Sequence, residues 1–211
     1  MLKNTDKVWY ACYGSNFQQE RFRCYISGGQ PPNAKRIYPG CSNKVFPKNN
    51  KALQIPGELY FAKSSKTWSG GGAAFIKYEP DSAQKVLGRM YLITREQFIE
   101  LVQQEIKFTG KFDIDLEQVK EKGHLDMKNG SWYDRIIYLG EEESYPIFSF
   151  TNEKFLASEI NSPHEFYLNI IIAGLRETYN LSPEEIRNYL KDKKGIAGTS
   201  MEKKLNELIE N

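Results

Sequence analysis

Histidine and cysteine are scarce in this chain of 211 residues, which has two histidines and three cysteines. His124 and His164 are too few for a histidine-rich metal site, so we expect no bound metal. The cysteines are odd in number and form no C-x-x-C pair, and the first residues do not resemble a signal peptide. We therefore expect a reduced protein of the cytoplasm, without a disulfide framework. The three cysteines are Cys12, Cys24 and Cys41.

A large charge of one sign and a long apolar run are also absent. The net charge is +2 and no long basic run occurs, so we do not expect a nucleic-acid partner. No apolar run approaches the ~18 residues of a membrane-spanning helix, so we expect no membrane insertion. Aromatic residues make up 13% of the chain, which excludes a disordered protein. One folded domain over residues 1–211 is the simplest organisation.

The hydrophobic patterns predict an α+β fold. Several strands follow one another without intervening helices, which argues against a doubly wound parallel sheet and favours a mixed, possibly barrel-like sheet. Strands are predicted at 7–13, 57–63, 73–78 and 86–93, and in WYDRIIYLG and YPIFSFT. Helices are predicted at 17–26, from Thr94, from 162 to about Tyr179, and within a helical tail at 182–211. We interpret 24–56 as a long irregular excursion with one or two short strands, and 107–130 as a polar insertion.

Three helices have recognisable starting signals. Thr94 and Gln97 have the spacing of a capping box, in which side chain and backbone bond each other reciprocally. The run SPHE at 162–165 predicts Ser162 as the residue that caps the next helix, with proline in the first helical position. The run SPEE at 182–185 repeats that signal.

The run YGSN at 13–16 predicts a sharp turn from a strand into a helix. Gly14 could adopt positive φ and end the strand abruptly. Asn16 would cap the helix, with Gln19 completing a capping box. The amides of Gly14, Ser15 and Asn16 could then form a pocket for an anion such as a carboxylate. The alternative is a well-made turn with no ligand.

The helix after Thr94 predicts a carboxylate that faces the interior. Phe98, Leu101 and Val102 form its apolar stripe, and the next position of that stripe is Glu105. Burial without a cation raises the pKa of a carboxyl group, which suits it to take and return a proton near neutral pH. The alternative is that Glu105 ends the helix, turns outward, or pairs with Lys107 or an arginine.

Five stretches, in order along the chain, resemble the gamma-glutamylcyclotransferase family. They are YGSN at 13–16, GGGAAF at 70–75, GRMYLITREQFIELVQQE at 88–105, GSWYDRIIYL at 130–139 and SPHEFYLNIIIAGLRETYNLSPEEI at 162–186. The resemblance covers most of residues 8–190, and the ordered set is more specific than YGSN alone. Two positions depart from the pattern. Ile106 stands where the family usually has glycine after its glutamate, and Phe148 where it tends to have tyrosine.

The resemblance implies a mixed, partly closed β-barrel with flanking helices, and a reaction that needs no cofactor. The α-amino group of a small gamma-glutamyl substrate would attack its own γ-carbonyl, releasing 5-oxoproline and a free amine or amino acid. Glu105 would be the catalytic residue. The substrate-binding residues would be Tyr13, Gly14, Ser15, Asn16, Tyr133 and Tyr167.

Two other interpretations stay open. The chain could be a non-catalytic module that binds an acidic metabolite or a peptide end in the same cavity. It could also be an interaction domain that uses the segments 24–56 and 107–130. Without the resemblance, Tyr133 and Tyr167 would be interpreted as plain core aromatics. We expect Tyr13 to pack at the end of its strand, and a contact of its hydroxyl with the pocket is the alternative. The sequence favours no particular leaving group and no oligomeric state.

Overall fold

The protein is described by a computed structural model that covers residues 6–31, 36–127, 130–156 and 158–210. Its contacts divide the chain into two compact units, each assembled from three separate segments. The first unit comprises Met1–Cys12, Glu20–Leu53 and Arg89–Asn152. The second unit comprises Tyr13–Gln19, Gln54–Gly88 and Glu153–Asn211. The chain therefore alternates between the two units along its length.

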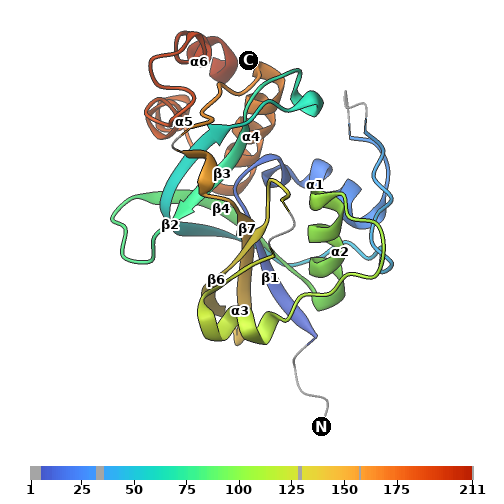
Figure 1. Cartoon of the computed structure of the whole chain (residues 1–211). Helices are drawn as coiled ribbons and strands as arrows, with labels where there is room; N and C mark the ends of the chain where they lie inside the picture. The colour runs from blue at the N-terminus through green and yellow to red at the C-terminus, as the bar shows by residue number, and fades with distance from the viewer. Residues whose placement is uncertain (1–5, 32–35, 128–129, 157, 211) are drawn as a thin grey trace. The chain divides into compact units, whose positions relative to one another are not determined.

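The described residues contain seven strands that belong to one mixed sheet, in the order β3-β2-β4-β1-β7-β6-β5 (Figure 1). Strand β1 is antiparallel to β4 and parallel to β7, which makes the sheet mixed. The order has two ends, β3 and β5, so the sheet is open. The α+β class is confirmed, but the expected partial closure into a barrel is not. The strands are β1 (Lys7–Cys12), β2 (Asn50–Ala62), β3 (Ala73–Tyr78), β4 (Lys85–Thr94), β5 (His124–Asp126), β6 (Arg135–Glu142) and β7 (Tyr145–Thr151).

An aromatic cluster centred on β1 forms the core of the first unit. The ring of Tyr10 on β1 lies 5.6 Å from that of Phe22, 6.1 Å from that of Phe98 and 5.5 Å from that of Phe150. These rings join β1 to two helices and to β7, because large aromatic side chains bury much apolar area in tilted or offset contacts. The helices of this unit are α1 (Gln19–Ser27), α2 (Arg95–Ile106) and α3 (Leu116–Lys122).

The second unit is built around the long helix α4 (Glu165–Tyr179). Gly174 lets this helix approach a 3-10 turn, η1 (Ser15–Phe17), because a Cβ at position 174 would lie only 2.5 Å from the Cβ of Phe17. Two shorter helices, α5 (Pro183–Leu190) and α6 (Ser200–Glu210), follow α4 and bury Ile186, Leu190 and Leu205. Their chain segments are the orange-to-red end of Figure 1.

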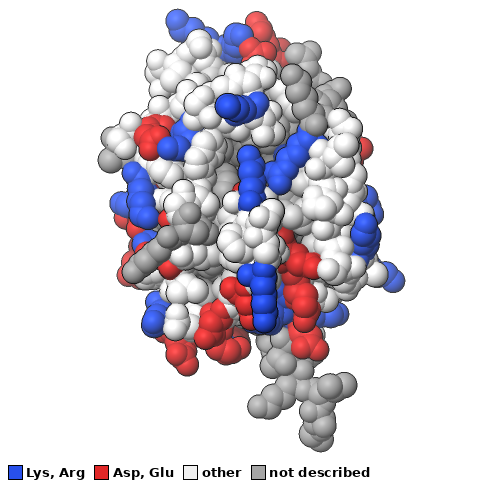
Figure 2. Space-filling model, turned by 45° about the vertical axis from the view of Figure 1, so that its right-hand side comes forward, with Lys and Arg blue, Asp and Glu red and all other residues white. Residues whose placement is uncertain are grey.

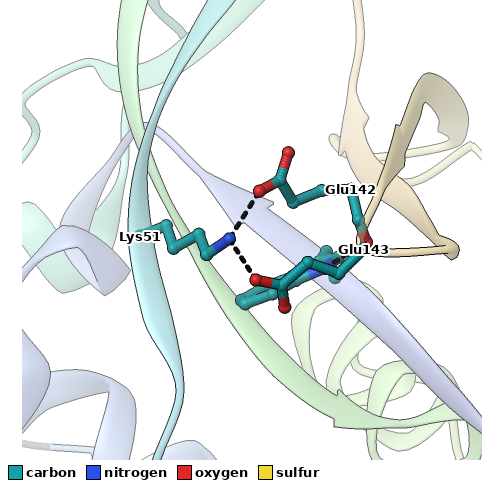
Figure 3. A network of polar contacts seen from close by, with 4 residues as sticks. Lys51, Glu142 and Glu143 are labelled. Atoms are coloured by element: carbon teal, nitrogen blue, oxygen red, sulfur yellow. Dashed lines mark hydrogen bonds and ion pairs between the residues drawn. The ribbon is translucent and has the colours of Figure 1, made fainter.

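A lysine from β2 joins the β6–β7 hairpin to the rest of the first unit (Figure 3). The Lys51 ammonium lies 2.5 Å from a Glu142 oxygen and 2.7 Å from a Glu143 oxygen. The same ammonium lies 5.6 Å from the centre of the Trp9 ring, and the Trp9 indole donates to the Glu142 carbonyl. These groups are partly exposed, so the network stabilises the hairpin only modestly.

Both irregular segments contain more regular structure than the sequence indicated. Strand β2 begins at Asn50, seven residues before the predicted start at 57, and the excursion is shorter as a result. The segment 107–130 contains the helix α3 and the strand β5. Asp115 caps α3, and the helix buries the side chains of Leu116 and Val119 in the core. The sequence analysis predicted neither of these elements within the insertion at 107–130. Residues 32–35 and 128–129 of these segments lie outside the described residues.

Two of the three predicted helix starts are confirmed. Thr94 and Gln97 make a complete capping box at α2, as do Ser182 and Glu185 at α5. The prediction for α4 was wrong, because His164 rather than Ser162 is the capping residue, and its Nδ1 accepts from the Phe166 amide at 3.2 Å. The Ser162 carbonyl instead accepts the Gly72 amide at 2.8 Å, which keeps it in an extended segment.

The surface carries charges of both signs. Figure 2 shows lysine and arginine together with aspartate and glutamate on the face in view. This mixture agrees with the near balance of 29 basic and 27 acidic residues. Among the described residues, no helix is long and apolar enough to cross a membrane.

Candidate functional site

The turn after β1 lies in the second unit and differs from the predicted one. Gly14 has φ −115°, so the predicted positive φ was wrong. Asn16 lies inside the 3-10 turn, buried at 4% exposure, and helix α1 begins only at Gln19. The predicted capping box of Asn16 and Gln19 therefore does not form. Gly14 itself occupies the capping position of the turn, which has no side-chain cap.

Tyr167 is the reason that position 14 requires glycine. A Cβ added at Gly14 would lie 2.9 Å from the Tyr167 hydroxyl oxygen, closer than side chains pack. That hydroxyl accepts the Ala74 amide at 3.1 Å. Its ring lies 4.4 Å from that of Trp68 and is itself buried. The structure thus brings together, within the second unit, three stretches that carried the family resemblance: YGSN, GGGAAF and the start of α4.

The two other predicted tyrosines are also positioned by packing. Tyr13 is buried at the end of β1, with 5% exposure. Tyr133 belongs to the first unit, is partly buried, and lies edge-on to Phe150 at 5.6 Å. The seven predicted site residues therefore divide between the units. Glu105 and Tyr133 belong to the first, and Tyr13, Gly14, Ser15, Asn16 and Tyr167 to the second.

Glu105 lies in the last turn of α2, on the stripe that the sequence predicted, and is partly buried. Burial raises the pKa of its carboxyl group above the ordinary value. The hydroxyl of Tyr25, which hydrogen-bonds the carboxylate, and the charges of Arg36, Arg21 and Lys107 act in the opposite direction and lower that pKa. Burial is the largest effect, so Glu105 holds its proton to higher pH than an exposed glutamate.

Tyr25, the hydrogen-bond partner of Glu105, belongs to a cluster of aromatic and basic side chains. The Tyr25 and Tyr38 rings lie 4.3 Å apart. Arg21 donates to the Tyr38 hydroxyl at 2.7 Å, and the Arg36 guanidinium lies 4.5 Å over the Tyr38 ring. The sequence analysis missed these four residues. The signal that could have found two of them is the spacing of Arg21 and Tyr25, which places both on one face of α1.

The two departures from the family pattern have structural explanations. Ile106 continues α2, and the helix ends at Lys107, which adopts the left-handed conformation with φ 54°. The residue in the left-handed conformation is therefore Lys107, one position after Ile106, which stands where the family usually has glycine. Phe148 is buried in an aromatic cluster, 5.8 Å from Phe98 and 5.7 Å from Tyr138. Phenylalanine suits this place because the packing there uses only its ring.

The described residues offer neither a metal centre nor a disulfide. No group of three or more His, Cys, Asp or Glu side chains among them could hold a metal ion. Cys12, Cys24 and Cys41 are buried and unpaired. Burial raises the pKa of the Cys12 and Cys41 thiols to about 12, which suits inert core residues rather than nucleophiles.

The sequence comparisons do not assign this chain to a family. No family model matches the sequence. A histone deacetylase 5 from Arabidopsis thaliana is 35% identical over 198 residues, covering 87% of this chain but only 30% of that protein. The chain thus spans about 30% of the length of this relative, whose name describes the whole protein.

Solved structures give a clearer result. A gamma-glutamyl cyclotransferase has a TM-score of 0.51 at 16% identity, over 97% of this chain and 99% of its own. An uncharacterized protein from Homo sapiens has a TM-score of 0.50 at 18% identity, over 98% and 99%. At this identity the similarity establishes the fold alone. This chain has the fold of gamma-glutamyl cyclotransferases.

Proposed function

We propose that this protein is an enzyme of the gamma-glutamyl cyclotransferase type, which converts a small gamma-glutamyl amide into 5-oxoproline and a free amine or amino acid. The observation that carries the proposal is Glu105. A partly buried carboxyl group of raised pKa, held by a tyrosine hydroxyl, occupies the position that the resemblance assigns to the catalytic residue. The shared fold supports the same reading.

Glu105 supplies the proton transfers of the reaction. The substrate's α-amino group is protonated at neutral pH, since a free α-amine titrates near ~8. Glu105 removes that proton, the amine attacks the γ-carbonyl carbon, and the bond to the leaving nitrogen breaks. Glu105 gives its proton to that nitrogen as the bond breaks. Its carboxylate then takes the second proton, which the attacking nitrogen must lose to become the lactam N–H, and passes it to the freed amine, which leaves as an ammonium ion. Its raised pKa makes the carboxylate a stronger base for the first step and brings the group closer to the pH at which it can also return the proton, while Tyr25 fixes its orientation.

The turn of the second unit binds and folds the substrate. We assign the amides of Gly14, Ser15 and Asn16 to the α-carboxylate or the polarised γ-carbonyl. Within the second unit, Tyr167 contacts this turn and Tyr13 precedes it, and we assign both to substrate binding; Tyr133 we assign to substrate binding from the first unit. Positioning of this kind matters because ring closure of a flexible chain can gain ~7–11 kcal/mol from orientation alone.

The decisive experiment is release of 5-oxoproline from a panel of gamma-glutamyl amino acids, amines and peptides, followed by mass spectrometry. Glu105→Gln should lower kcat by ~10²- to 10⁴-fold, the usual contribution of general acid–base catalysis. Glu96→Gln is the matched control, because Glu96 is an exposed carboxylate on the same helix.

Two results would contradict the proposal. One is the absence of turnover across the whole panel, which would leave a non-catalytic binding module as the better interpretation. The other is equal turnover by the wild-type protein and Glu105→Gln. We further place the enzyme in the reducing cytoplasm as a single domain, in keeping with its three unpaired cysteines.

A further inference from the structure

A pocket of about 390 Å³ lies in the first unit. The residues that line it come from the C-terminal end of α2 and from the segment after α1. Those that matter here are Arg36, Ser42, Glu100, Gln104, Lys107 and Phe108. Its volume is within the range of small-molecule sites, ~300–1,000 Å³. The segment after α1 is part of the excursion that fits the family pattern poorly, so the resemblance assigns this pocket no role.

Within the part of the chain that the structure describes, no carboxylate forms an ion pair with two cations of the pocket, Arg36 and Lys107. Arg36 donates one hydrogen bond, at 2.8 Å, to the Gln104 carbonyl and stacks over Tyr38. This contact caps the end of α2 but uses little of a guanidinium that carries five N–H donors. Lys107 is exposed, and among the described residues it makes neither a hydrogen bond nor an ion pair through its ammonium.

The Glu100 carboxylate, which also lines the pocket, already accepts two hydrogen bonds from Ser42. Glu100 accepts the Ser42 amide at 2.9 Å and the Ser42 hydroxyl at 2.5 Å. These two bonds hold Glu100 against the segment after α1, where it acts as a structural anchor. Glu100 therefore forms an ion pair with neither Arg36 nor Lys107, the two cations of the lining.

We propose that this pocket binds a small anion between the Arg36 guanidinium and the Lys107 ammonium. The planar fork of arginine suits the paired oxygens of a carboxylate or phosphate, and lysine adds a mobile point charge. The ligand class is a compact carboxylate or phosphate rather than a long apolar molecule, since Phe108 is the one aromatic ring in the lining.

The pocket is electrostatically coupled to Glu105. Arg36 and Lys107 also lower the pKa of the Glu105 carboxyl group. An anion held by both would offset their charges, so that pKa would rise when the pocket fills. Coupling of this kind is reciprocal, and the anion must therefore bind more tightly when Glu105 is neutral. Glu105→Gln, which is always neutral, should bind the anion at least as well as the wild-type protein near neutral pH.

The test is an NMR titration of the full chain with inorganic phosphate and, separately, with succinate. We expect saturable shifts at the amides of Gly40, Ser42 and Phe108. Lys107→Asn should weaken binding about tenfold, the order expected of one lost charge-assisted contact. Asparagine also tolerates the left-handed conformation of this position, so the fold should survive. Arg36→Gln should act in the same direction.

Lys111→Asn is the control, since it removes the same charge four residues away and outside the pocket. The proposal is overturned if neither probe binds saturably at low ionic strength. It is equally overturned if Lys111→Asn weakens binding as much as Lys107→Asn, which would reveal unspecific charge attraction.

A competition experiment identifies the natural source of the anion. One possible source is the leaving part of the substrate, which rests on the proposed function. In that case a gamma-glutamyl compound that carries a carboxylate on its leaving part should displace phosphate from Glu105→Gln. The same compound with that carboxylate converted to an amide should not displace phosphate. If neither compound displaces phosphate, the pocket holds a separate anion that acts on Glu105. A protein that binds phosphate but releases no 5-oxoproline would disprove the proposed function and leave the pocket standing.

Discussion

Glu105 links the stability of the first unit to pH. Its folded-state pKa lies above the ordinary value of 4.5, so the native protein holds this proton over a pH range in which the unfolded chain has lost it. Stability therefore falls as pH rises from the ordinary value through the raised one. Each unit of difference corresponds to ~1.4 kcal/mol.

Glu105→Gln should remove this dependence, since glutamine resembles the protonated acid at every pH. In urea unfolding, we expect the variant to gain stability relative to the wild-type protein as pH rises from acidic to neutral. A stability difference that stays constant with pH would contradict the raised pKa.

Gly14 is sensitive to any side chain because of its neighbour on α4. Gly14→Ala would place a Cβ 2.9 Å from the Tyr167 hydroxyl oxygen, and should cost ~1–3 kcal/mol of stability through overpacking. Tyr167→Phe removes that oxygen and, with it, the hydrogen bond that the Ala74 amide donates to it. The double variant should therefore be more stable than the sum of the single effects, which thermal unfolding of all four proteins can measure. Strict additivity would refute the contact.

The residues divide into those that periodicity reveals and those that only tertiary contacts reveal. Glu105 was predictable because it continues a stripe visible within eight residues of sequence. At Gly14 the sequence analysis expected a positive φ, which does not occur; the contact that favours glycine there comes from Tyr167, more than 150 residues later, and no local pattern reveals it. Arg36 was not predictable either, because its segment has no regular pattern that would orient it towards Glu105.

The β6–β7 hairpin contains a strained turn. Its two connecting residues, Glu143 and Ser144, have φ of 52° and 64°, as a type I′ turn requires, although glycine and asparagine favour that geometry. Ser144→Gly should therefore stabilise the protein by ~0.5–1 kcal/mol, and it leaves the Glu143–Lys51 ion pair in place. Ser200→Gly, at an exposed serine without positive φ, should have no stabilising effect. A lower unfolding midpoint for Ser144→Gly would show that the turn is unstrained.

At the scale of elements, local chemistry decided which predictions succeeded. The capping boxes at Thr94 and Ser182 were found because their partners are three residues apart. Ser162 failed because a distant amide, that of Gly72, binds its carbonyl and leaves His164 to begin α4. Helix α3 was missed because its seven residues give too short a pattern for periodicity to detect.

The class of the whole molecule followed from the order of its elements, but the outline of its sheet did not. Consecutive strands excluded a doubly wound fold without any knowledge of their pairing. Closure of a sheet depends on which strands form its edges, and no local pattern identifies β3 and β5 as edges. The interleaving of the two units was equally hidden, because it depends on contacts between segments far apart in the sequence.

That interleaving leads us to expect that the whole chain unfolds in one cooperative transition. Strands β2 and β4 each contribute residues to both units, so neither unit can lose these strands without disturbing the other. All three cysteines belong to the first unit and are buried, so their thiols report its opening. Val86, fully buried in the second unit, offers the matching position there.

Thiol labelling across a urea series should therefore give one midpoint for the native cysteines and for the added thiol of Val86→Cys. Below that midpoint labelling should be slow, because burial raises the pKa of the Cys12 and Cys41 thiols to about 12 and leaves little thiolate to react. If the Val86→Cys thiol instead reacts at lower urea than the native three, the second unit opens alone. The proposed single domain would then have to be divided along the boundary at which β2 and β4 pass from one unit to the other.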